Sequence, residues 1–154
     1  MEAIEFIKMS METSKNMVMG MITDMKDAPL TQPTPKGGNH PLWVLGHLTY
    51  SEASLLDDVM LGETNPLAVT DANHYPAFDE LATKFEEVRA RTLTVLNGLT
   101  AADLDKPCKG CPPGSEDFLG TVGRCFSLIA LHPAMHGGQV ADARRAAGRK
   151  PVMG

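Results

Sequence analysis

Hydrophobic residues recur every three or four positions in four long stretches of the chain, with polar residues between them. This spacing places the apolar side chains on one face of a helix, so it predicts four amphipathic helices. The stretches cover residues 2–27, 41–61, 77–98 and 116–147. Because each helix is long and has an apolar face to bury, we expect an all-α fold, a four-helix bundle.

Proline and glycine mark where the predicted helices begin and end. These markers are Pro29, Pro41, Gly62, Gly98 and Gly148. Ser115 precedes two acidic residues, a pattern typical of the N-cap of a helix, here the fourth. The connections between the helices are long and cover residues 28–39, 62–76 and 100–117. No stretch alternates apolar and polar residues for long enough to predict a sheet, and residues 1–154 are expected to form a single domain.

The apolar face of the fourth predicted helix includes two histidines. Its inward positions are Phe118, Val122, Cys125, Ile129, His132, His136, Val140 and Ala143. His132 and His136 are four residues apart and therefore share a face of the helix. His47 lies on an inward-facing stripe of the second predicted helix, one turn after Trp43. Three imidazoles from two helices are therefore expected to meet at one point inside the bundle.

Three neutral imidazoles are suitable ligands for a divalent transition metal, with zinc, nickel and iron as the candidates. A set of three histidines leaves at least one coordination position open, which is typical of catalytic metal sites. The alternative is that His47, His132 and His136 are hydrogen-bonded core residues that hold no metal. Spacing alone leaves both interpretations open.

The residues around the histidine pair are unfavourable in a helix. Pro133 lacks a backbone N–H, and Gly137 and Gly138 follow within about a turn. Such a departure within an otherwise regular helix is typical of a functional site. Pro133 is expected to kink the helix. The glycines either permit the close approach of another helix or a ligand, or serve backbone packing alone.

Two sequence elements resemble the DinB family, also called DinB/YfiT-like metalloenzymes. The elements are Trp43-Val44-Leu45-Gly46-His47-Leu48 and His132-x-x-x-His136-x-Gly138-Gln139. The resemblance extends over essentially the whole chain and includes the ending Arg144-Arg145 with Gly148. It implies a four-helix bundle in which His47, His132 and His136 bind a divalent metal. Gln139 would then support a metal ligand or pack in the bundle.

The resemblance also implies a reaction class and an assembly. Members of this family are often homodimers, and several are similar to transferases or isomerases that use a low-molecular-weight thiol. Two departures, Pro133 and Gly137, affect the expected shape of the pocket more than the metal ligands.

Composition narrows the class of protein. Hydrophobic residues make up 43% and charged residues 21%, which excludes a disordered chain. A net charge of −5 disfavours a nucleic-acid partner. No apolar run approaches the roughly 18 residues needed to span a membrane, and no signal peptide is visible. We therefore expect a cytoplasmic protein with reduced thiols. The six methionines between Met9 and Met25 favour core packing over copper binding.

The cysteines give a weaker signal than the histidines. Cys108 and Cys111 form a C-x-x-C between prolines, without a second cysteine pair for a zinc ribbon. We interpret this segment as a solvent-side loop, with redox chemistry or metal capture as the less favoured alternative. Cys125 lies on the apolar stripe of the fourth helix and is expected to be a core thiol.

The remaining candidates carry no assigned chemistry. His40 and His74 lie in predicted loops, one and two residues before a proline, and are interpreted as cap or surface residues. Glu52, Asp57 and Asp58 lie in the second predicted helix, and none is assigned a catalytic role.

Two hypotheses for function follow. The first is a metal-dependent enzyme, a hydrolase or thiol-dependent transferase, that acts on a small molecule. The second is a non-catalytic helical dimer or ligand-binding protein whose histidines are core groups.

Overall fold

A computed structural model describes residues 1–28, 30–31, 34, 37–65, 67 and 77–152. The described residues contain five α-helices, one π-helix and one 3-10 helix, and no strand. The elements are α1 (Ala3–Thr23), α2 (Pro41–Ser54), η1 (Leu55–Leu61), α3 (Phe78–Asn97), η2 (Ala101–Asp105), α4 (Glu116–Leu119) and α5 (Val122–Ala146). The prediction of an all-α fold is therefore confirmed. His74 lies outside the described residues.

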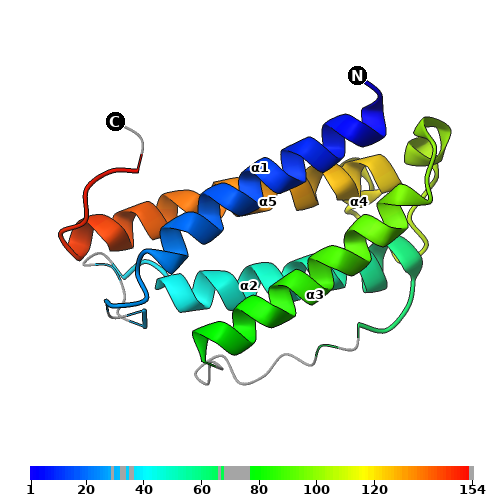
Figure 1. The fold of residues 1–154 in the computed structure, drawn as a ribbon. Helices are drawn as coiled ribbons and strands as arrows, with labels where there is room; N and C mark the ends of the chain where they lie inside the picture. The colour runs from blue at the N-terminus through cyan, green and yellow to red at the C-terminus, as the bar shows by residue number, and fades with distance from the viewer. Residues whose placement is uncertain (29, 32–33, 35–36, 66, 68–76, 153–154) are drawn as a thin grey trace.

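The long helices lie side by side in two pairs that run in opposite directions (Figure 1). The first halves of α1 and α5 share one apolar cluster, which includes Met11 and Phe126, and their second halves share another, which includes Met21 and Val140. α1 and α5 are therefore parallel to each other. The same comparison shows that α2 and α3 are parallel to each other and antiparallel to α1 and α5. Parallel neighbours need a long crossover, which explains the length of the 62–77 connection.

The second predicted helix is divided between α2 and η1. η1 is a π-helix, and the carbonyl groups of its last turn, like those of any helix end, have no partner within the helix. The carbonyls of Val59 and Met60 accept hydrogen bonds from Gly110 N (2.9 Å) and Lys109 N (3.2 Å). Gly62 ends the element in the left-handed conformation (φ 65°), as its position as a helix stop predicted.

The fourth predicted helix, 116–147, is two helices, so its start was predicted wrongly. Ser115 precedes only the single turn of α4, and the side chain of Thr121 caps α5 by accepting from Arg124 N at 3.3 Å. The break arises because the chain around Thr121 pairs with another segment: Val122 N donates to Lys106 O (3.0 Å) and Cys108 N donates to Gly120 O (3.1 Å). As a consequence Phe118 leaves the apolar stripe and is 61% exposed.

The first helix also ends earlier than predicted, at Thr23 and not at residue 27. Residues 24–27 form turns whose N–H groups bond to the last carbonyls of the helix, such as Met25 N to Ile22 O at 3.0 Å. Asp24 in this turn pairs with the Arg144 side chain near the end of α5, and Arg149 pairs with Asp27. These ion pairs fix the C-terminal ends of the two parallel helices to each other.

A buried ion pair joins α2 to α3. Arg89 Nη2 lies 2.7 Å from Glu52 Oε2, and Arg89 Nη1 donates to the carbonyl of Met11 on α1 at 3.0 Å. Arg89 is 1% exposed and Glu52 4%. Burial raises the pKa of Glu52, and the nearby Arg89 opposes this rise. The pair therefore specifies how α1, α2 and α3 fit together, at the cost of two desolvated charges.

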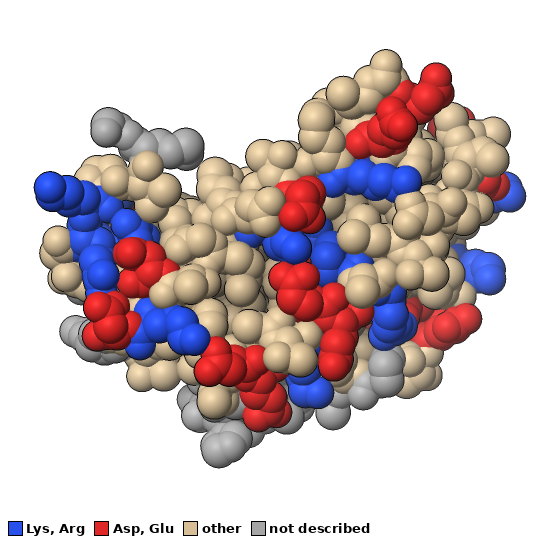
Figure 2. All heavy atoms as spheres, viewed as in Figure 1, with Lys and Arg blue, Asp and Glu red and all other residues tan. Residues whose placement is uncertain are grey.

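The surface carries charges of both signs. On the face formed by α1 and α3, acidic and basic side chains are interspersed (Figure 2), and Lys15 of α1 contacts Glu86 of α3 at 3.2 Å. Among the described residues, no helix is both long and apolar enough to cross a membrane.

Two glycines give opposite predictions for stability. A Cβ at Gly138, on the exposed side of α5, would meet nothing within 4 Å, so Gly138→Ala is expected to stabilise the protein by about 1 kcal/mol through helix propensity. A Cβ at Gly110 would lie 1.9 Å from Asp58 O, so Gly110→Ala is expected to cost about 3 kcal/mol. Urea unfolding of both variants measures the difference, and equal effects would contradict the packing described here.

The ion pair predicts a non-additive double-mutant cycle. Arg89→Met leaves the buried Glu52 carboxylate without its partner and is expected to lower the free energy of unfolding by about 3–5 kcal/mol. Adding Glu52→Leu removes the unpaired charge and should restore most of this loss. Denaturant unfolding of the wild type, both single variants and the double variant tests the coupling. Additive losses would show that the two side chains do not act as a pair.

Candidate metal centre

His47 is placed by the start of α2. His40 is the N-cap of this helix, and its Nδ1 accepts a hydrogen bond from Trp43 N at 2.9 Å. Pro41 occupies the first turn, where a missing N–H is tolerated. The prediction that His40 is a cap residue is therefore confirmed. With the start of the helix fixed, His47 follows Trp43 by one turn on the same face.

His132 and His136 are placed one turn apart on α5. The helix continues through Pro133, so the proline at which a kink was predicted does not end it. Residues next to the two histidines are buried and help to hold α5 in place in the bundle. Pro133 and Gly137 are buried, and a Cβ at Gly137 would lie 3.2 Å from Met21 Cε on α1. Gly137 thus leaves room for the Met21 side chain of α1.

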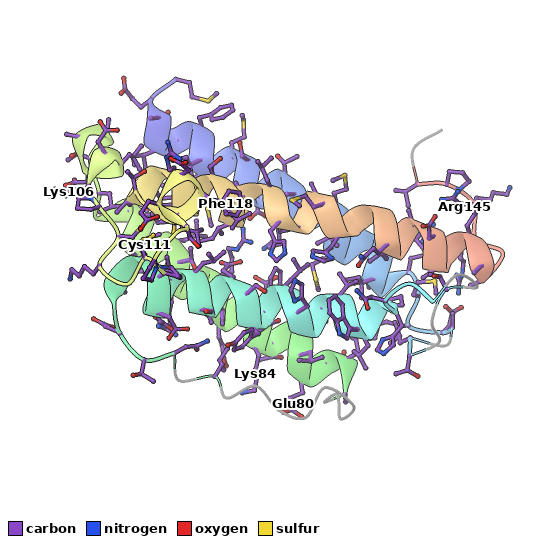
Figure 3. The ribbon with its side chains drawn as sticks, turned by 180° about the vertical axis from the view of Figure 1, so that it is seen from behind. Glu80, Lys84, Lys106, Cys111, Phe118 and Arg145 are labelled. Carbon is purple, nitrogen blue, oxygen red and sulfur yellow. The ribbon has the colours of Figure 1, made fainter. Side chains whose placement is uncertain are left out.

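The three imidazoles converge through their Nε2 atoms. His47 Nε2 lies 3.2 Å from His132 Nε2, and His136 Nε2 lies 3.0 Å from His132 Nε2. One nitrogen from each ring lies within 4.8 Å of the other two, and all three side chains are partly buried. Figure 3 shows α2 and α5 facing each other from this side of the molecule. The predicted meeting of His47, His132 and His136 is therefore confirmed as a geometry.

The separations between these nitrogens fit a metal ion. Imidazole nitrogens about 2.0–2.1 Å from a metal are about 3.3 Å apart in a tetrahedral arrangement and about 3.0 Å apart at adjacent octahedral positions. The observed 3.0 and 3.2 Å fall at these values. The donor set is thus positioned for a divalent transition metal, and the spacing is compatible with either coordination geometry.

The outer ring nitrogens have partners of their own. His136 Nδ1 lies 3.0 Å from Gln139 Oε1, so it carries the proton when the ring is neutral and leaves Nε2 free to bind a metal. His47 Nδ1 lies 3.5 Å from Ser51 Oγ, at the outer limit of a hydrogen bond. Sequence reasoning missed Ser51. Its position four residues after His47 is the signal that could have indicated it.

Trp43 covers one side of His47. The two rings are stacked, with centroids 4.6 Å apart and planes 12° from parallel, and Trp43 also lies 6.0 Å from the ring of His136. Stacking restricts the orientation of the His47 ring and excludes water from one of its faces. Trp43 is also the single tryptophan of the chain, so its fluorescence reports directly on this site.

The environment keeps two of the histidines uncharged at neutral pH. Burial, followed by the neighbouring His136 and His47, lowers the pKa of His132 to about 4. Burial, followed by His136, also lowers the pKa of His47 below its usual value. Only neutral imidazole binds a metal, so these two rings are ready to do so at neutral pH.

The acidic residues of α2 and η1 have other partners. Glu52 is paired with Arg89, Asp57 with Arg91, and Asp58 accepts from Ser54 Oγ (2.7 Å) and Asn65 N (2.8 Å). Within the described part of the chain, the group of potential metal ligands around His132 consists of histidines alone. Each of these three acids is thus held by a partner outside the histidine cluster.

A comparison with protein-family models gives an independent result. The model described as the DinB superfamily matches residues 10–140, a span that contains all three histidines. The chain belongs to the DinB superfamily. A search of curated proteins found no significant match for it.

The cysteines of this DinB protein are placed differently from the prediction. Cys125 is fully buried, as expected of a core thiol. Cys108 is also buried, at 8% exposed, so the interpretation of its segment as a solvent-side loop was wrong for this residue. The reason is that the segment folds back onto η1 through the hydrogen bonds of Lys109 and Gly110.

The lowered histidine pKa values predict how the stability of the metal-free DinB protein depends on pH. Unfolded histidine has a pKa of about 6.5, whereas that of folded His132 is about 4. Between these values the unfolded chain binds more protons than the folded one, so the free energy of unfolding falls as pH falls, and His132 contributes no further loss below about pH 4.

Urea unfolding with chelator present, measured at pH values between those two pKa values, gives the pH dependence of the free energy of unfolding. His132→Asn is the matched control because it shares all the other titrating groups with the wild type. The wild type should lose more stability toward acid pH than the variant. Identical slopes would contradict a neutral His132.

Proposed function

We propose that this DinB-superfamily protein is a metal-dependent enzyme in which His47, His132 and His136 bind one divalent transition metal, zinc, nickel or iron. The reaction class is hydrolysis or thiol-dependent group transfer on a small molecule. The observation that carries the proposal is the position of His132 Nε2, which lies 3.2 Å from His47 Nε2 and 3.0 Å from His136 Nε2 while the outer nitrogen of His136 is engaged by Gln139. A ring nitrogen such as His132 Nε2 carries either one proton or one lone pair, so hydrogen bonds among the rings do not account for both short contacts.

The protein side chains would hold the centre in place and leave it open to substrate. Gln139 orients His136 and Trp43 orients His47, so the rings are fixed before a metal binds. A divalent metal at such a site supplies Lewis acidity and lowers the pKa of a water or thiol. The partial exposure of all three histidines leaves a path for a small substrate.

The charge of the donor set supports the choice of reaction class. Three neutral imidazoles contribute no negative charge, unlike the carboxylates of many metal sites. A metal held by such ligands keeps its full positive charge and therefore favours an anionic ligand, such as a hydroxide or a thiolate. Hydrolases and thiol-dependent transferases both use a nucleophile of this kind.

We also expect the enzyme to act as a cytoplasmic homodimer. Support for a contact between copies comes from large apolar side chains that are exposed on the neighbouring helices α1 and α5. These are Phe6 (56%), Met9 (47%), Leu131 (57%) and Met135 (67%). Sedimentation equilibrium measures the assembly directly.

Metal binding can be followed through the single tryptophan. Nickel added to chelator-treated protein is expected to quench Trp43 fluorescence with a one-to-one end point, because Trp43 stacks on His47. His136→Ala should abolish this binding. Gln139→Ala should weaken it by about 10–100-fold, because it loses the partner that orients His136.

A matched control removes a histidine outside the centre. His40→Asn deletes an imidazole from the same helix but retains N-capping ability, so its affinity for nickel should equal that of the wild type. Equal affinity in the wild type and His136→Ala would contradict the proposed ligands.

Catalysis requires its own test. Chelator-treated protein should be inactive on a panel of activated esters and thiol-accepting electrophiles, and one of zinc, nickel or iron should restore turnover in the wild type but not in His132→Ala. A melting temperature that neither chelator nor added metal changes would favour the non-catalytic alternative, in which the histidines are core groups.

A further inference from the structure

The three cysteines of the chain gather at the end of the bundle opposite Arg145. Cys108 Sγ lies 3.6 Å from Cys125 Sγ, although the residues are 17 positions apart. Cys111 packs against the same apolar cluster as these two residues and is close enough to influence the ionisation of both thiols. Figure 3 labels Cys111 at this end, near Lys106 and Phe118. All three cysteines are free thiols.

The backbone holds the segment of Cys108 and Cys111 firmly. Cys108 N donates to Gly120 O at 3.1 Å, and the next two N–H groups donate to carbonyls of η1. Gly110 lies so close to Asp58 O that a side chain would collide with it. Cys108 is therefore fixed against the first turns of α5, where Cys125 lies. The contact between the two sulfurs is a consequence of this packing and not of a flexible loop.

We propose that Cys108, Cys111 and Cys125 form a thiol–disulfide exchange centre that reacts with low-molecular-weight disulfides, with Cys111 as the first nucleophile and a Cys108–Cys125 disulfide as the product. This centre is independent of the histidine site. It also differs from a simple C-x-x-C pair, because the final bond joins Cys108 to α5 and leaves Cys111 free.

Exposure assigns the order of the steps. Cys111 is partly exposed, whereas Cys108 is 8% exposed and Cys125 fully buried. Burial raises the pKa of the Cys108 thiol and of the Cys125 thiol above their usual range, so neither is the first nucleophile for a reagent in solution. The two buried sulfurs must close by about 1.5 Å to reach bonding distance, a movement that side-chain rotation and small backbone shifts can supply.

The exchange balances in three steps. The Cys111 thiolate attacks the reagent disulfide, which forms a mixed disulfide at Cys111 and releases one thiolate. Cys108 sulfur then attacks Cys111 sulfur, which forms Cys108–Cys111 and releases the second thiolate. Cys125 sulfur attacks Cys108 sulfur and frees Cys111. In total, the two thiols of Cys108 and Cys125 are oxidised to a disulfide, and one reagent disulfide is reduced. The protons of the two cysteines pass to the two thiolates that the reagent releases.

Oxidised glutathione is the probe for this centre. The native, reduced wild-type protein is incubated with one molar equivalent of it, quenched with acid, alkylated and mapped by mass spectrometry of its peptides. The expected product has one alkylated cysteine, Cys111, and a disulfide between the peptides of Cys108 and Cys125. The melting temperature of this product should be higher than that of the reduced protein, because the bond constrains the unfolded chain.

Two variants separate the roles of the cysteines. Cys111→Ser should slow the loss of thiols at least tenfold, because the buried sulfurs are screened from the reagent. Cys125→Ala, which keeps a small apolar side chain, should stop at a Cys108–Cys111 disulfide. Far-UV circular dichroism confirms folding, and mapping of the wild type does not depend on either variant.

Three results would overturn the proposal. One is a wild-type product with Cys108–Cys111 as the stable disulfide. Another is glutathione retained on Cys111 while Cys108 and Cys125 remain reduced. The third is a folded wild-type protein whose thiols do not react with the probe.

Discussion

The contact of three imidazoles at the facing surfaces of α2 and α5 is the interaction on which the site depends. It requires that the two helices run in opposite directions and in one register, because a shift of α2 by one residue would turn His47 away from His132. The bundle supplies this register from outside the site. Gly137 accommodates the Met21 side chain of α1, and the pair of Glu52 and Arg89 joins α2 to α3 and to the backbone of α1.

The same helix connects the two reactive groups of the protein. Cys125 precedes His132 by two turns on α5, a distance of about 10 Å along the axis. The cysteine end is closed by hydrogen bonds between the 106–121 segment and η1, and the opposite end is closed by ion pairs of Arg144 and Arg149. The histidines lie between these ends, so their positions depend on helix packing more than on any loop.

The sequence was sufficient to predict the features that depend on the spacing of residues close together in the chain. The four-residue spacing of His132 and His136, and the N-cap and proline at the start of α2, were sufficient to predict the convergence with His47. The prediction failed where hydrogen bonds join distant segments. The break before α5 results from pairing of Thr121 with the chain near Pro107, and the burial of Cys108 results from carbonyls that η1 presents to the 109–110 turn. Neither interaction has a local signal in the sequence.

The most direct test of the account is anomalous X-ray diffraction from crystals of the purified protein, recorded across the absorption edges of zinc, nickel and iron. The account predicts one anomalous peak per chain, about 2.0–2.1 Å from the Nε2 atoms of His47, His132 and His136. Crystals grown with excess metal that show these rings hydrogen-bonded to one another, with no anomalous peak between them, would contradict it.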